Sequence, residues 1–113
     1  MLNSQRRISQ SSFPQILKEG RSFFTPNLSL RVSPKKERGF SAFSFVISAK
    51  AVKTAVERNL LKRRGRHVIK KHLKLIKDGY FCAFFFKKDL LRFPFSAFEQ
   101  EFLFVLKKAN LLK

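Results

Sequence analysis

Acidic residues are scarce in this chain of 113 residues, and this scarcity is the first constraint on its function. Seven Asp and Glu stand against 25 Lys and Arg, which gives a formal net charge of +18 at pH 7. Self-repulsion of that size in so small a body is normally tolerated because a polyanion neutralises it. Nucleic acid is the leading candidate, since a phosphate backbone releases counterions when Lys and Arg displace them. An anionic membrane surface ranks second.

Cysteine and long apolar runs are also rare. Cys82 is the single cysteine, so an internal disulfide is excluded, and with His67 and His72 it gives no recognisable zinc spacing. We therefore expect no structural metal. The longest apolar stretch, Tyr80 to Phe86, is far shorter than the ~20 residues that a membrane-spanning helix needs. We expect that stretch to be a buried strand.

The N-terminal residues lack the apolar stretch of a secretory signal. Arg6 and Arg7 are followed closely by the polar run Ser9 to Ser12, so we expect a cytoplasmic protein. Residues 1–12 as a whole are polar and basic without any period, which predicts a flexible basic arm.

Apolar residues are plentiful, at 44% of the chain with 15 Phe, and they argue against a wholly disordered basic tail. The length suits one core, so we expect a single domain over residues 13–113. Hydrophobic periods predict its elements in the order α-β-β-α-β-α. They are a short helix from Phe13 that stops at Gly20, strands over 28–32 and 43–47, a long helix from Lys50 to about Lys77, a strand over 80–86, and a last helix beginning near Ser96.

These elements predict an α+β fold, a single-domain sandwich in which helices pack on a small mixed β-sheet. We expect the first two strands to pair as a hairpin with a basic tip over residues 33–39. We expect Ser96 to cap the last helix, with Glu99 completing a capping box. Periodicity also predicts that at least three quarters of the Phe residues pack in the core, with Phe13 as the exception to test.

Basic residues recur every four positions on the predicted long helix. Arg58, Lys62, Arg66 and Lys70 stand in one row, with Asn59 and Arg63 alongside. A charge run is usually a solvated helix face. Here, however, only Glu57 and Asp78 are acidic between residues 50 and 79, so the usual i,i+4 pairing is missing. The row therefore favours RNA contact, with phosphates bridging the cations.

Two segments resemble the bacterial ribonuclease P protein family. The run Ala55-Val56-Glu57-Arg58-Asn59, followed by Lys62-Arg63 and Arg66, is similar to its signature helix. The run Phe13 to Phe23 is similar to its opening helix and the turn that follows, and a strand like Leu28-Ser29-Leu30 comes next. The two matches occur in the family's order and separation, and the resemblance covers the chain from about Phe13 to the last helix.

The resemblance implies a ribonuclease P subunit that assists a catalytic RNA in removing the 5′ leader of precursor tRNA. Magnesium would be held mainly by the RNA, and the protein alone would be inactive. A left-handed crossover through the long helix is implied as well. The catalytic RNA would contact Lys50, Lys53, Arg58, Asn59, Lys62, Arg63 and Arg66. A cleft between the first helix and the open sheet face would hold the leader, with Phe13, Leu17, Arg21, Ser22 and Arg31.

Three positions depart from the family pattern. Leu60 stands where the signature normally has Arg, and Arg64 is a candidate replacement. Leu17 stands in place of the second leader-facing aromatic residue, and it cannot stack on a base. Ala49-Lys50 replaces a pair of Lys before the helix, so that cluster is one charge weaker.

Other functions remain alternatives at this point. A ribosomal protein or a general RNA chaperone would permit the same charge and fold class. A membrane-surface protein would need an exposed apolar face beside the basic one. An enzyme acting without RNA is disfavoured because the acidic residues show no paired spacing and no Ser or Cys constellation with His stands out. We expect the partners to include neither membrane nor DNA.

Overall fold

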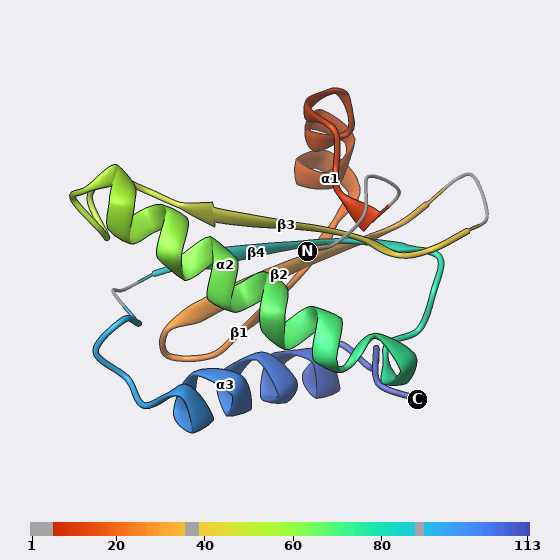
Figure 1. Ribbon diagram of the computed structural model, residues 1–113. Helices are drawn as coiled ribbons and strands as arrows, with labels where there is room; N and C mark the ends of the chain where they lie inside the picture. Colours follow the sequence, from red (N-terminus) through yellow and green to blue (C-terminus); the bar gives the residue numbers. More distant parts are fainter. Residues whose placement is uncertain (1–5, 36–38, 88–89) are drawn as a thin grey trace.

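The protein is built on one four-stranded sheet with helices on both faces (Figure 1). The computed structural model describes residues 6–35, 39–87 and 90–113. Its elements are the 3-10 turn η2 (Gln10–Ser12), α1 (Phe13–Glu19), β1 (Arg21–Phe24), β2 (Leu28–Pro34), β3 (Ala42–Ile47), α2 (Ala55–Lys71), the 3-10 turn η3 (Leu73–Leu75), β4 (Tyr80–Phe86) and α3 (Phe95–Lys108). The predicted α+β class and element order are confirmed, with β1 as one additional strand.

The strands lie in the order β1-β2-β4-β3. The sequence predicted a hairpin between residues 28–32 and 43–47, which belong to β2 and β3, and that prediction is wrong. β4 lies between them, antiparallel to β2 and parallel to β3. The actual hairpin joins β1 to β2 through a turn at Thr25, whose amide donates to the Leu28 carbonyl oxygen at 2.9 Å. β4 is apolar on both faces, which suits its central position between β2 and β3. The alternation of apolar and polar residues along β2 and β3 shows which face is buried but not which strand lies beside them. The predicted basic tip lies partly outside the described residues, which omit 36–38.

The chain passes from β3 to the parallel strand β4 through α2. In Figure 1, α2 lies in front of the sheet, both strands run from right to left, and β4 lies below β3. That arrangement is a left-handed crossover, against the usual preference for right-handed connections. It agrees with the fold that the resemblance implied.

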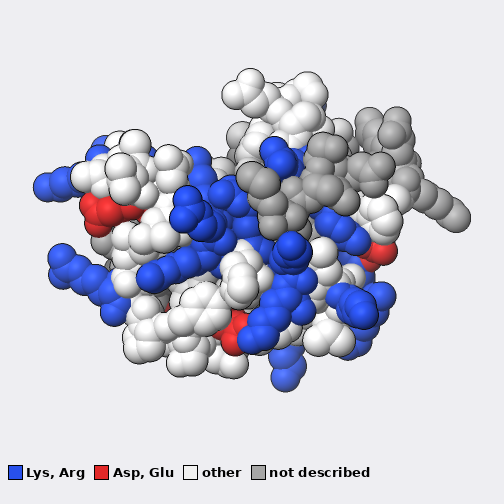
Figure 2. Space-filling model, viewed as in Figure 1, with Lys and Arg blue, Asp and Glu red and all other residues white. Residues whose placement is uncertain are grey.

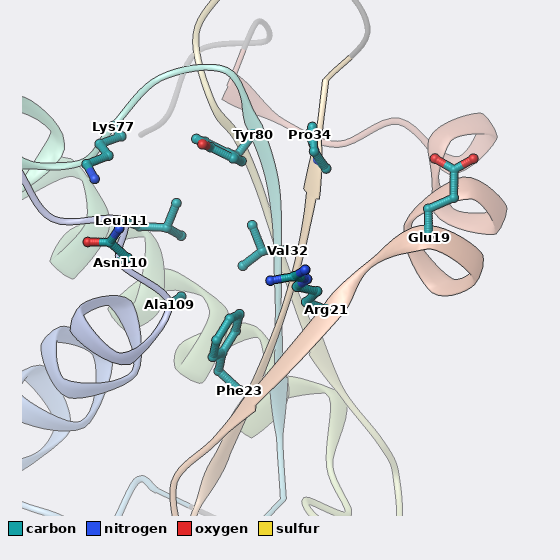
Figure 3. Close-up of a pocket in the computed structure, with 10 residues that line it drawn as sticks. All are labelled: Glu19, Arg21, Phe23, Val32, Pro34, Lys77, Tyr80, Ala109, Asn110 and Leu111. Carbon is teal, nitrogen blue, oxygen red and sulfur yellow. The ribbon is translucent and has the colours of Figure 1, made fainter.

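The core lies between the sheet and the two longer helices. Phe45 of β3 and Phe84 of β4 stack with ring centroids 5.6 Å apart, and Phe102 of α3 lies 4.8 Å from Phe84. Leu61 and Ile69 of α2 are fully buried against this cluster. α1 packs on the opposite face of the sheet (Figure 3). The protein therefore has one sheet face closed by α2 and α3, and a second face only partly covered by α1.

Six of the 15 Phe are buried, so the expectation of three quarters in the core was too high. All six that the periods had favoured are among the buried ones: Phe43, Phe45, Phe84, Phe86, Phe98 and Phe102. Four others are exposed, namely Phe24, Phe40, Phe95 and Phe104.

α2 is shorter than predicted at both ends, because Thr54 caps its start and the helix ends at Lys71. The Glu57 amide donates to Thr54 Oγ1 at 3.2 Å, and that hydroxyl donates to Glu57 Oε1 at 2.7 Å. Lys50 and Lys53 therefore lie in the loop before the helix. Helical spacing in the sequence predicts Val56 on the apolar side of this helix, but the residue is 78% exposed.

The predicted capping box at Ser96 is wrong. α3 begins at Phe95 after Pro94, with no side-chain hydrogen bond at its cap. Glu99 instead accepts from Lys71 Nζ at 3.0 Å and lies 3.1 Å from His72 Nε2, which joins α3 to the end of α2. A sequence pattern could not separate these two uses of one carboxylate.

Arg7 and Ile8 of the predicted arm contact the edge strand β3. Arg7 forms a parallel bridge with Phe43, the Ile8 amide donates to the Phe43 carbonyl oxygen at 3.3 Å, and Arg6 lies 3.6 Å from Asp78. Residues 1–5 lie outside the described part of the chain. The flexibility of the whole arm stays a prediction.

Candidate RNA interface

Four cations of α2 gather on one outward side of the helix. Lys62, Arg63, Arg66 and Lys70 together form the α2 basic face, and Figure 2 shows the surrounding basic surface in blue over this element. Within the described residues, none of these four side chains has an ion-pair partner. The acid shortage noted in the sequence therefore leaves this helix face without a compensating carboxylate among the described residues.

Two small hollows border this face. One, of about 210 Å³, is lined by Lys62 and Arg66 together with Arg7 of the N-terminal segment. The other, of about 320 Å³, lies between Arg63 and Lys70. Arg7 is a basic contributor that helical spacing could not identify, because it reaches α2 only through its bridge to β3.

Arg58 differs from the rest of its predicted row. Its guanidinium donates to the carbonyl oxygens of Val52 at 2.8 Å and Lys53 at 3.0 Å, so it fixes the loop before α2. Asn59, one residue further, is exposed, as are Lys50 and Lys53. The seven predicted contacts to the catalytic RNA thus lie partly on the helix and partly on the loop that Arg58 secures.

Arg31 holds α1 on the sheet. Its Nε donates to the Ile16 carbonyl oxygen at 3.1 Å, another nitrogen donates to Ser22 Oγ at 3.0 Å, and a third donates to the Leu17 carbonyl oxygen. Gly20 makes this approach possible, because a Cβ there would lie 2.7 Å from Arg31 Cγ. Arg31 therefore positions the helix, and Ser22 accepts a hydrogen bond that helps to hold Arg31 in place. The predicted contacts of both residues with the leader stay predictions.

The face of the sheet beneath α1 carries aromatic rings that sequence reasoning did not assign to a site. Ala83 is the partner of Arg31 across β2 and β4, so Phe81 and Phe85 stand on the same face, and both are only partly buried. Their alternation with Cys82 and Phe84 was a usable signal. Phe13 is partly buried and Leu17 is 51% exposed on α1.

Arg21 lies apart from the other four residues predicted for the leader. It is the partner of Val32 in the β1–β2 pair, which places its side chain on the α3 side of the sheet (Figure 3). Ser22, the next residue, is the partner of Arg31 on the α1 side. A strand alternates its side chains between faces, so these two neighbours cannot serve one surface.

The two histidines occupy ordinary positions. His67 is exposed, with its ring 5.7 Å from that of Phe95, and His72 contacts Glu99. Cys82 is buried in the core, and burial raises the pKa of its thiol to about 12. The neutral thiol that results is not a nucleophile.

Comparison with known proteins identifies the family. The family model described as Ribonuclease P matches residues 1–110. The chain belongs to the ribonuclease P protein family. Among its relatives, the ribonuclease P protein component of Chloroflexus aurantiacus is 30% identical over 113 residues, which cover 99% of this chain and 82% of that protein. The chain is therefore a subunit of ribonuclease P, an RNA-binding protein of tRNA processing, and its partner in the holoenzyme is RNA.

Solved structures of the same family share the fold. The RNase P protein of Staphylococcus aureus aligns with a TM-score of 0.85 at 23% identity, covering 96% of this chain and 98% of that one. The Thermotoga maritima protein aligns with a TM-score of 0.81 at 24% identity, covering 90% and 96%. In the part of the chain that the structure describes, no helix combines the length and apolar character required to cross a membrane.

Proposed function

We propose that the α2 basic face binds the catalytic RNA of ribonuclease P and that the RNA, not the protein, cleaves precursor tRNA. The observation that carries this is the absence of ion-pair partners for Lys62, Arg63, Arg66 and Lys70 within the described residues. Phosphates would supply the missing negative charge, and release of their counterions would drive binding. Asn59 and the exposed loop residues Lys50 and Lys53 extend the same contact.

The α1 side of the sheet is proposed to hold the single-stranded leader of precursor tRNA. Phe81 and Phe85 offer partly exposed rings on a face that α1 only partly covers, and Phe13 adds a third at the helix. Unpaired bases stack on such rings without sequence preference. Arg31 and Ser22 would contribute indirectly, since their hydrogen bonds set the position of α1.

Magnesium is proposed to be held mainly by the RNA subunit. The described residues contain no group of three or more His, Cys, Asp or Glu that could hold a metal ion. We assign the protein no step that passes through the ion. Its contribution is to neutralise charge and to increase affinity for the substrate. The site of action would be the cytoplasm, without DNA as a partner.

Reconstitution tests the proposal. The full chain is mixed with the catalytic RNA of the same source, and cleavage of precursor tRNA is measured at low magnesium. We expect the protein to increase cleavage, and we expect none from protein freed of all RNA. Cleavage by the protein alone would contradict the proposal that the RNA subunit is the catalyst. Tight binding to ribosomal RNA without an effect on cleavage would favour the alternative, a ribosomal protein or general RNA chaperone.

A further inference from the structure

A separate pocket lies on the side of the sheet away from α1, where the chain after α3 meets β1 and β2. It encloses about 440 Å³, within the range of roughly 300–1,000 Å³ typical of small-molecule sites. The buried side chains of Val32 and Leu111 line it, and the rings of Phe23 and Tyr80 stand beside them (Figure 3). We call this the β1–α3 pocket.

Two cations and a phenol border this apolar surface. Arg21 extends from β1 toward Val32, and Lys77 lies in the segment before β4 (Figure 3). Among the described residues, the side chains of Arg21, Lys77 and Tyr80 have no hydrogen-bond or ion-pair partner. Glu19, the acidic residue at the rim, points away from the other lining side chains on the far side of β1 (Figure 3). The pocket therefore combines aromatic surface with uncompensated positive charge.

That combination selects a narrow class of ligand. An aromatic ring pair beside an apolar surface favours a flat ring, and the two cations favour an anion joined to it. A nucleotide has both parts, and only an unpaired base can present its ring, because a base in a duplex is already stacked. Acidic peptides would satisfy the cations but would leave the rings of Phe23 and Tyr80 without a partner.

We propose that the β1–α3 pocket binds one nucleotide of single-stranded RNA. The base would contact Phe23 and Tyr80, and its phosphate would lie between Arg21 and Lys77. The inference rests on the proposed function in requiring an RNA partner. It adds an RNA contact on the face of the sheet opposite α1. The nucleotide in this pocket is therefore not one that lies under α1, although both can belong to one RNA that passes around the β1 edge.

Amide chemical shifts of the full chain, titrated with uridine monophosphate, test the location. We expect shifts at Phe23, Tyr80 and Asn110 that saturate together, with smaller changes at Ile16 on the other face. Absence of shifts at the pocket, or shifts confined to the α1 side, would overturn the proposal.

Affinity for a short oligouridylate then tests the assigned roles. Tyr80→Leu should weaken binding roughly tenfold, while Tyr80→Phe, which keeps the ring, should bind like the parent chain. Arg21→Gln and Lys77→Gln should each lower the salt dependence of log K by about 0.7. Lys74→Gln is the matched control, because this exposed lysine carries the same charge outside the pocket lining.

Each result has a distinct meaning. If Lys74→Gln and Arg21→Gln lowered the salt dependence of log K equally, binding would reflect general charge attraction, and the pocket assignment would be wrong. Unchanged oligouridylate affinity in a folded Tyr80→Leu variant would also contradict the assignment. The melting temperature of each variant confirms its folding. Failure of the proposed function would instead appear as unchanged catalytic-RNA affinity in Lys62→Ala, a residue remote from this pocket.

Discussion

Arg31 of β2 donates a hydrogen bond from Nε to the carbonyl oxygen of Ile16 at 3.1 Å, and this contact ties the last turn of α1 to the sheet. The Ile16 side chain is fully buried beside it. Helix α1 has only seven residues, too few for stability by itself, so its position depends on such contacts. Arg31 therefore positions α1, and its contact with the leader stays a prediction.

Replacing Arg31 by Ala should therefore destabilise the fold by about 1–3 kcal/mol, because the carbonyl oxygens of Ile16 and Leu17 lose a charged donor that ties α1 to the sheet. Chemical denaturation measures this change. Arg21→Ala is the control on the neighbouring strand, and we expect it to stay within about 0.5 kcal/mol of the parent because its side chain has no partner among the described residues. Equal stability of the two variants would contradict the positioning role.

Arg58→Ala and Lys62→Ala should separate structure from RNA binding. Each removes one cation, so each should reduce the slope of log K against log salt for the catalytic RNA by about one unit. Only Arg58→Ala should also lower stability, by about 1–2 kcal/mol, because the Val52 and Lys53 carbonyl oxygens lose their donor. Salt titrations and thermal unfolding of both variants measure this. An unchanged slope in Lys62→Ala would contradict the phosphate contact.

Phe13→Ala should weaken affinity for precursor tRNA about tenfold, since stacking contributes roughly 1–3 kcal/mol per base. Affinity for mature tRNA should not change. The ring is partly buried, so stability should fall by less than the ~3–5 kcal/mol expected for a fully buried Phe. Holoenzyme binding of both tRNAs and the melting temperature measure these effects. Equal losses for precursor and mature tRNA would remove Phe13 from the leader site.

Gly65→Ala tests the packing of α2 on β3. Helix propensity alone would stabilise the protein by about 1 kcal/mol. A Cβ at this position would lie 2.7 Å from Phe45 Cδ1, however, and that ring packs against both Phe84 and Phe102. Overpacking costs about 1–3 kcal/mol, so we expect net destabilisation. In a Phe45→Leu background the effect of Gly65→Ala should shrink or reverse, and denaturation of the double-mutant cycle measures it.

Glu99 should make stability depend on pH in the acid range. Hydrogen bonds from Lys71 and then His72 hold the pKa of this carboxyl below its ordinary value of 4.5. A lowered folded-state pKa adds stability that is fully present above the unfolded-state value and is lost as pH falls through the folded-state pKa. Comparing the pH dependence of unfolding in Glu99→Gln with the parent measures this contribution. Identical acid-range profiles would contradict it.

Much of the fold could be predicted from the chain. Charge imbalance indicated a polyanion, apolar periods gave the α+β class and most elements, and the run from Ala55 to Arg66 indicated the family. Each of these signals is local, because helix spacing and strand alternation depend on residues a few positions apart. The family match and the shared fold confirmed them, whereas the individual RNA contacts stay predictions.

Only the tertiary structure decided which residues meet. It placed β4 between β2 and β3, moved Arg21 and Ser22 to opposite faces, and engaged Arg58 and Arg31 with backbone carbonyl oxygens. Several pairings of the same strands satisfy the same alternation, and the cost of closing each loop differs little. A cation that donates to its own backbone has the same local sequence as one without such a bond. Long-range contacts therefore determined the site, and they are not encoded in any short window of sequence.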